Sequence, residues 1–172
     1  MNHRKIVLSL CTSLDFFIEG ENGAIDWCLT DQDYSMTSFL ERIDTILLGR
    51  ISYEQLIRDL PNAFADKRKI VFSTSLRNVE KGYELIKAAP DQAMHEILSA
   101  PGKDLWLFGG AKLAASFLTH NLIDEMMISI HPLLLGKGKP LFHDFDKRTN
   151  LKLTDSKVFS TGLVQLYYQV NK

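Results

Sequence analysis

Residues 104–142 read DLWLFGGAKLAASFLTHNLIDEMMISIHPLLLGKGKPLF, and the first part of this stretch indicates the fold. The apolar run at 105–108 is typical of a buried strand, and residues 111–118 carry apolar side chains at helical spacing. Gly109 and Gly110 therefore occupy a strand-to-helix turn, where glycine permits a ligand to approach the backbone closely. The helix N-terminus adds unpaired N–H groups and a partial positive charge, and both suit phosphate. A tight turn without a ligand would use the same glycines.

Apolar runs and helix-like segments alternate along the rest of the chain. The strand-like runs cover residues 6–10, 45–48, 70–72, 105–108 and 126–130, and the helix-like segments cover 36–43, 52–58, 93–98 and 113–118. Near the end, strand-like runs at 151–159 and 163–170 flank a turn signal at 160–162. The pattern predicts an α/β fold: one domain over residues 1–172, a three-layer sandwich with a mixed, mostly parallel central sheet and a C-terminal antiparallel hairpin.

Composition argues against several classes of partner. The chain has 172 residues, 45% of them hydrophobic and 24% charged, with a net charge of -1, so no basic excess favours nucleic acid. No apolar stretch approaches the roughly 20 residues of a membrane span. The start, MNHRKIVLSL, lacks a cleavage-site pattern. We therefore expect a cytoplasmic protein that acts on a small molecule and binds neither nucleic acid nor membrane.

Cysteine and histidine usage predicts no metal site. A chain of this length buries roughly 70% of its unfolded surface, so it needs neither a disulfide nor a metal to fold. Cys11 and Cys28 are expected to be free thiols. There is no CxxC motif and no histidine pair at metal-ligand spacing. The histidines are scattered, at His3, His95, His120, His131 and His143.

The chain contains four distinctive segments in this order: TSLDFFIEGENGAIDW (12–27), DTILLGRISYE (44–54), KIVFSTSL (69–76) and the stretch at 104–142. Together they resemble the dihydrofolate reductase-like superfamily, in particular the reductase domain of bacterial riboflavin-biosynthesis proteins, the RibD C-terminal domain. The resemblance implies an NADPH-dependent reductase of a small heterocycle: a 5-amino-6-(5-phosphoribosylamino)uracil-type pyrimidine of riboflavin biosynthesis, or a pterin. It also implies a homodimer formed through the C-terminal strands.

The same resemblance implies where the phosphates of NADPH bind. Gly49, Arg50 and Ser52 match the family's phosphate-binding turn, although Ser52 alone also fits a helix cap. The hydroxyl residues after the next strand match the surroundings of the adenosine 2′-phosphate, with an ordinary polar turn as the alternative: Ser73, Thr74 and Ser75. Some relatives have an arginine where this chain has Thr74, and Arg77 or Lys69 could supply that charge.

Further residues would surround the nicotinamide half of the cofactor. The turn at the glycine pair would lie beside the diphosphate and the nicotinamide ribose, and the matching residues are Gly109, Gly110, Ala111 and Leu113. In the family, the two glycines are often joined by a cis peptide. Cys11 and Thr12 would approach the carboxamide through their backbone, and Ile18 would pack on the ring. Ordinary strand and loop packing is the alternative for these three.

The N-terminal segment departs from the family pattern. Phe16 stands where relatives have glycine, so either the loop is reshaped or Phe16 fills part of the substrate pocket. Trp27 is expected to be a pocket wall or part of the core. A partly buried carboxylate near Trp27 could protonate the substrate, and the candidates are Asp26, Asp31 and Asp33. For Asp31 the alternative role is a helix N-cap. True dihydrofolate reductases have an acid at the position of Gln32.

Other polar residues near the strands are interpreted as structural. Asp124, Glu125 and His131 lie at strand ends and are left out of the predicted active site. Two alternatives to the reductase remain open. One is a non-catalytic NADP(H)-binding or regulatory module on the same fold, and the other is a phosphate-binding scaffold unrelated to redox chemistry.

Overall fold

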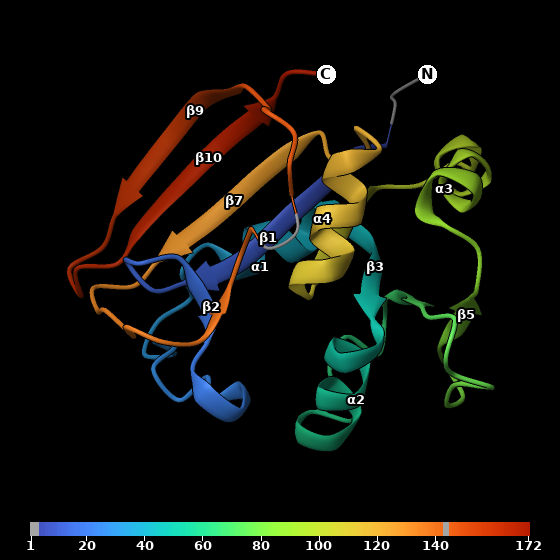
Figure 1. Ribbon diagram of the computed structural model, residues 1–172, viewed down its shortest axis with the longest axis horizontal. Helices are drawn as coiled ribbons and strands as arrows, with labels where there is room; N and C mark the ends of the chain where they lie inside the picture. Colours follow the sequence, from blue (N-terminus) through green and yellow to red (C-terminus); the bar gives the residue numbers. More distant parts are fainter. Residues whose placement is uncertain (1–3, 143–144) are drawn as a thin grey trace.

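The computed structural model describes residues 4–142 and 145–172. Eight strands form one sheet in the order β5-β4-β3-β6-β1-β7-β10-β9, and β2 pairs with β8 separately (Figure 1). The strands are β1 (Ile6–Thr12), β2 (Phe17–Glu19), β3 (Ile43–Gly49), β4 (Arg68–Phe72), β5 (Glu84–Ile86), β6 (Asp104–Gly109), β7 (Glu125–Ile130), β8 (Lys139–Pro140), β9 (Leu151–Val158) and β10 (Val164–Val170). The helices are α1 (Met36–Arg42), α2 (Arg50–Asp59), α3 (Pro90–Ser99) and α4 (Ala111–Thr119), with a short 3₁₀ turn, η1 (Glu21–Gly23).

The sheet is mixed and mostly parallel, as the sequence predicts. The strands from β5 to β7 in the sheet order all pair in parallel. β10 runs antiparallel to both β7 and β9, so the end of the chain forms the predicted hairpin. Gly162 turns this hairpin with a φ of 86°, a conformation that glycine adopts without steric cost.

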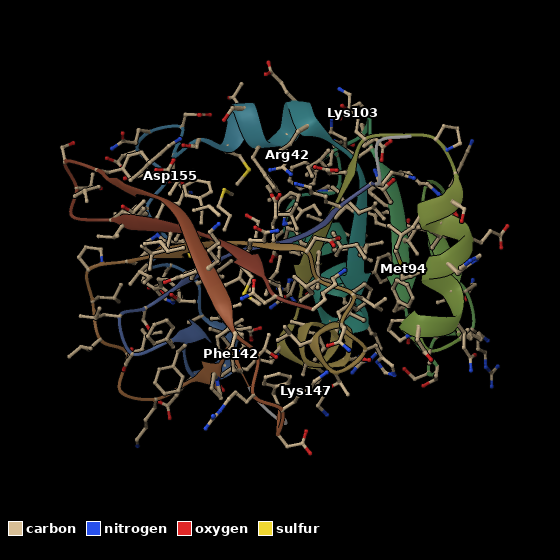
Figure 2. The ribbon with its side chains drawn as sticks, turned by 90° about the horizontal axis from the view of Figure 1, so that it is seen from above. Arg42, Met94, Lys103, Phe142, Lys147 and Asp155 are labelled. Atoms are coloured by element: carbon tan, nitrogen blue, oxygen red, sulfur yellow. The ribbon has the colours of Figure 1, made fainter. Side chains whose placement is uncertain are left out.

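Helices cover both faces of the sheet. Along β1, Ile6 and Leu8 belong to the hydrophobic cluster that contains residues of α3 and α4, whereas Val7 belongs to the cluster that contains residues of α1 and α2. Figure 2 shows α1 and α4 on opposite sides of the sheet. Burial of both faces explains why the parallel strands appear in the sequence as continuous apolar runs.

Three short strands were not predicted. β5 and β2 each have three residues and β8 has two, too few to show an alternating pattern. In β2 and β8, Phe17 pairs with Pro140 and Glu19 with Lys139, which holds the loop after β7 against the N-terminal loop. Within the described ranges, no helix is long and apolar enough to cross a membrane.

Candidate active site

Two helix N-termini meet where the parallel strands end. Gly49 closes β3 and is the N-cap of α2, and Gly110 follows β6 and is the N-cap of α4. In the described part of the chain, neither helix has a side-chain cap, so their first N–H groups are free to bind a ligand. A methyl group on Gly49 would lie 3.4 Å from the Gly109 carbonyl oxygen and 3.7 Å from Leu113 Cβ. The two turns are therefore in contact.

Of the residues predicted on the nicotinamide side, Gly109, Gly110 and Leu113 lie at this junction. The Gly109–Gly110 peptide is cis, as the family resemblance implied. Ala111 is 2% exposed at the start of α4, and Leu113 is half-buried. Ile18 is also half-buried and packs against the core on the α3 and α4 side of the sheet.

Two cations lie beside the glycine turns. Arg50 begins α2, is exposed, and its Nη1 donates to both carboxylate oxygens of Glu54 at 2.9 Å. A methyl group on Gly110 would lie 3.9 Å from Lys139 Nζ and 3.6 Å from the hydroxyl oxygen of Ser52. Lys139 also forms an ion pair with Glu19 at 3.1 Å. The loop after β7 thus brings one ammonium group close to the glycine pair.

At the end of β4 the hydroxyl residues have mixed roles. The Ser73 hydroxyl accepts hydrogen bonds from the backbone N–H groups of Ser75 and Leu76, at 3.3 and 3.2 Å, so it stabilises the turn itself. Thr74 and Ser75 are exposed.

Lys69 is not free to supply a charge at this turn. It is 8% exposed, donates to the Phe64 carbonyl at 3.0 Å, and lies over the ring of Tyr83. Of the two cations considered from the sequence, the exposed Arg77 is the one left for a phosphate here.

The loop after β1 turns through a left-handed backbone conformation at Phe16. Phe16 has a φ of 61° and is 47% exposed, so its ring does not fill a buried pocket. The Asp15 carboxylate accepts hydrogen bonds from the Ser13 hydroxyl at 2.5 Å and from the N–H groups of Leu135 and Gly136 at 3.1 and 2.7 Å. These bonds, that of Ser13 foremost, hold the pKa of Asp15 below its ordinary value. They tie this loop to the segment after β7.

Trp27 forms one wall of an open hollow of about 550 Å³. Its Nε1–H donates to the Ala24 carbonyl at 3.1 Å, and its ring meets the ring of His131 edge-on, with centroids 5.2 Å apart. The other lining residues are Gly20, Glu21, Ala24, Asp26, Leu135, Gly136 and Lys137.

The position of Asp31 differs from both predicted roles. Its carboxylate is exposed and accepts a hydrogen bond from the Tyr34 hydroxyl at 2.5 Å, whereas the proposed acid requires a partly buried group. The N-cap alternative is wrong, because α1 begins at Met36 and Asp33 accepts the Thr37 N–H at 3.0 Å instead. The Asp33 side chain lies two residues closer to the helix and reaches its first turn.

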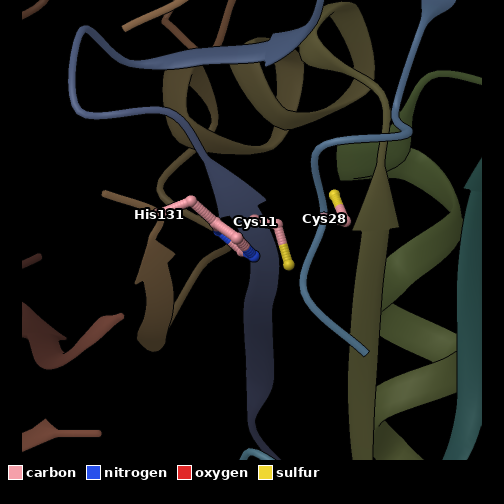
Figure 3. A group of neighbouring side chains, drawn as sticks. All are labelled: Cys11, Cys28 and His131. Atoms are coloured by element: carbon pink, nitrogen blue, oxygen red, sulfur yellow. The ribbon is translucent and has the colours of Figure 1, made fainter. Parts of the chain in front are cut away.

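One cluster at the end of β1 was missed by the sequence analysis. Cys11, Cys28 and His131 bring their ligand-type atoms within 4.8 Å of one another (Figure 3). The Cys28 thiol can donate a hydrogen bond to the Cys11 thiolate, and this interaction lowers the pKa of Cys11. The same interaction, together with burial, raises the pKa of Cys28. Burial lowers the pKa of His131. Next to this cluster, the hydroxyl of Thr12 is buried without a hydrogen-bond partner among the described residues.

Local spacing gave no signal for this cluster. Thr12 pairs with Ile130 in the parallel register of β1 and β7, and the His131 N–H donates to the Thr12 carbonyl at 2.7 Å. The register therefore places His131 beside the end of β1.

Comparison with known proteins agrees with this geometry. The RibD C-terminal domain family matches residues 4–165. The uncharacterized protein YyaP of Bacillus subtilis is 40% identical, over 99% of this chain and 97% of its own. A putative riboflavin biosynthesis protein from Shewanella sp. PV-4 superposes with a TM-score of 0.86 at 26% identity, covering 98% of this chain and 99% of that one.

A deaminase and 5-amino-6-(5-phosphoribosylamino)uracil reductase from Thermotoga maritima shares the fold, with a TM-score of 0.77 at 14% identity. The alignment covers 98% of this chain and 57% of that longer one. Both neighbouring structures share the fold of this chain. The chain belongs to the RibD C-terminal domain family and has its dihydrofolate reductase-like, riboflavin-biosynthesis-type reductase fold.

Proposed function

We propose that this protein is an NADPH-dependent reductase of a small heterocyclic substrate. The observation that carries the proposal is the meeting of two uncapped helix N-termini, at Gly49 and Gly110, with Arg50 and Lys139 beside them. Backbone N–H groups, helix dipoles and two cations around glycines suit the diphosphate of a dinucleotide. Family membership supports reduction as the chemistry.

The residues present fit this cofactor. Gly49 and Gly110 leave room for the backbone to approach phosphate, and the Ser52 hydroxyl beside Gly110 can donate to it. We assign Arg50 to a phosphate group, and Thr74, Ser75 and Ser73 to the adenosine 2′-phosphate. Bound NADPH would supply the hydride. The backbone of Cys11 and Thr12 would orient the nicotinamide, with Ala111, Leu113 and Ile18 beside it.

The substrate would occupy the hollow beside Trp27. An aromatic wall suits a flat pyrimidine or pterin, and Lys137 on the rim suits the ribose phosphate of a 5-amino-6-(5-phosphoribosylamino)uracil-type pyrimidine. Because Asp31 is exposed, we assign the proton to solvent water that reaches this open hollow.

A second candidate is a non-catalytic NADP(H)-binding or regulatory module. It is favoured by Phe16 in the family's glycine position and by the absence of an acid at Gln32. Such a module would bind the nucleotide without oxidising it in the presence of a substrate.

The proposal is tested by titrating the protein with NADPH and NADH while monitoring the fluorescence of Trp27 and Trp106. Arg50→Ala should weaken NADPH binding about 10- to 100-fold, the loss expected for a hydrogen bond to a charged group. Arg58→Ala is the matched control, because Arg58 is exposed at the other end of α2 and pairs with Asp59.

Turnover separates the two candidates. NADPH oxidation that depends on an added pyrimidine or pterin supports the reductase, whereas tight binding without oxidation by either class favours the regulatory module. If neither nucleotide binds, or if both arginine variants bind as the unmodified protein does, the proposed cofactor site is refuted.

We also propose a homodimer formed through the C-terminal hairpin. β9 is one of the two outer strands of the sheet and is exposed along all eight residues. It carries Leu153 at 52% and Val158 at 78% exposure, and an uncovered apolar edge strand favours pairing with a second copy. Sedimentation of the protein and of a Leu153→Lys variant tests this: the variant should be monomeric.

A further inference from the structure

Three side chains of metal-ligand type meet at the end of the sheet, from parts of the chain that are far apart in sequence. Cys11 lies on β1, Cys28 on the loop between η1 and α1, and His131 directly after β7 (Figure 3). Their ligand atoms all lie within 4.8 Å of one another. We propose that Cys11, Cys28 and His131 bind one Zn²⁺ ion through two thiolates and one imidazole nitrogen.

His131 is arranged as a metal ligand. Its Nδ1 lies 3.2 Å from the Ser129 carbonyl oxygen, which only accepts hydrogen bonds, so Nδ1 carries the proton and Nε2 keeps a lone pair. His131 is 1% exposed, and its Nε2 is buried without a hydrogen-bond partner in the part of the chain that the structure describes. Buried polar atoms without a partner are rare. Histidines that bind metal commonly donate their other ring N–H to a backbone carbonyl.

The separation of the ligand atoms suits a tetrahedral ion after a small adjustment. Zn–S bonds of about 2.3 Å place two thiolates roughly 3.8 Å apart, so the cluster would contract by at most about 1 Å. Cys28 lies in an irregular loop, outside the helices and strands, where its side chain can move toward Cys11. Figure 3 shows the His131 ring directed toward Cys11.

The ligand set and its charge favour zinc over hard cations. Two sulfurs and one imidazole suit Zn²⁺, whereas Mg²⁺ and Ca²⁺ prefer oxygen ligands. On binding, each thiol releases its proton to solvent, and the two thiolates balance the two charges of the ion, so this half-buried position gains no net charge. Three protein ligands leave a fourth position for water, which is typical of catalytic rather than structural zinc sites. This proposal differs from the sequence prediction, based on the spacing of cysteines and histidines along the chain, that the protein binds no metal.

The test uses the full chain, reduced and freed of metal with a chelator, and no nucleotide. Co²⁺ should produce thiolate charge-transfer and visible bands that saturate at one ion per chain, and an equimolar amount of Zn²⁺ should remove them. Cys11→Ser and Cys28→Ser should each weaken the charge-transfer bands, because each removes one of two thiolates, and the double variant should abolish them. His131→Gln should weaken Co²⁺ binding at least about tenfold. His120→Gln is the matched control, because His120 is exposed and its Nδ1 also lies near a backbone carbonyl, 2.7 Å from Ser116.

A second measurement needs no variant and so does not depend on variant folding. Bound Zn²⁺ should slow alkylation of both cysteines in the unmodified protein at least about tenfold. The proposal is overturned if His131→Gln binds Co²⁺ as tightly as the control. It is also overturned if Zn²⁺ leaves the alkylation rates unchanged, or if the cysteines form a disulfide that Zn²⁺ does not prevent.

Discussion

Gly138→Ala should damage the junction between the N-terminal loop and the loop after β7. Gly138 has a φ of 153°, and a methyl group there would lie 2.1 Å from the Glu19 carbonyl oxygen and 3.3 Å from Gly20 Cα. Both are backbone atoms, one in β2 and one directly after it, so the clash cannot be relieved by rotation of a side chain. At this φ, which L-residues rarely adopt, alanine loses about 1–3 kcal/mol, and overpacking costs about 1–3 kcal/mol. We therefore expect a loss of about 2–6 kcal/mol in the free energy of unfolding.

Gly136→Ala separates the two contributions. Gly136 has a φ of 71°, and no described atom lies within 4 Å of the position of its methyl group. It should therefore lose about 1–2 kcal/mol from the dihedral alone. Urea denaturation followed by circular dichroism measures both losses through the midpoint at constant slope.

The two variants should also differ in NADPH binding. Gly138→Ala pushes β8 away from β2 and moves Lys139, which lies next to Gly110, so it should weaken NADPH binding more than Gly136→Ala does. Equal losses of stability in the two variants would refute the steric argument. Unchanged NADPH affinity in a folded Gly138→Ala protein would refute the role given to Lys139.

Two further substitutions test strain and a buried charge. Phe16→Gly should raise the free energy of unfolding by about 0.5–1 kcal/mol. Glycine removes the left-handed backbone strain at this exposed residue, and the greater entropy of the unfolded chain offsets part of that gain. A lower urea midpoint would show that the Phe16 ring makes stabilising contacts. Asp44→Ala should lower the free energy of unfolding by about 2–3 kcal/mol, because it leaves the buried Arg4, 5% exposed, without its carboxylate partner. This loss is smaller than that for a fully buried ion pair, because the Asp44 side chain is 36% exposed. Adding Arg4→Met to Asp44→Ala should recover part of that loss in the same urea assay. If the double variant instead loses the sum of the losses of the two single variants, Arg4 and Asp44 do not stabilise each other.

The long elements could be predicted because their signals are local. Apolar periodicity marked all four helices and the long strands, and the glycine turns at Gly49 and Gly110 lie at strand ends, as expected. β2 and β8 could not be predicted, because such short strands exist only through their pairing with each other. The N-cap role given to Asp31 is wrong because α1 begins only at Met36, where the Asp33 carboxylate accepts the Thr37 N–H instead.

The sequence by itself determined the α/β class, the C-terminal hairpin and the glycine turns suited to phosphate, since each depends on residues close together in the chain. Only the tertiary structure decided which distant side chains share one site. Residues 11 and 131 meet because β1 and β7 pair in parallel, with Thr12 opposite Ile130. That register is set by burial of both faces of the sheet, and a shift of one residue would turn the same side chains to the opposite face.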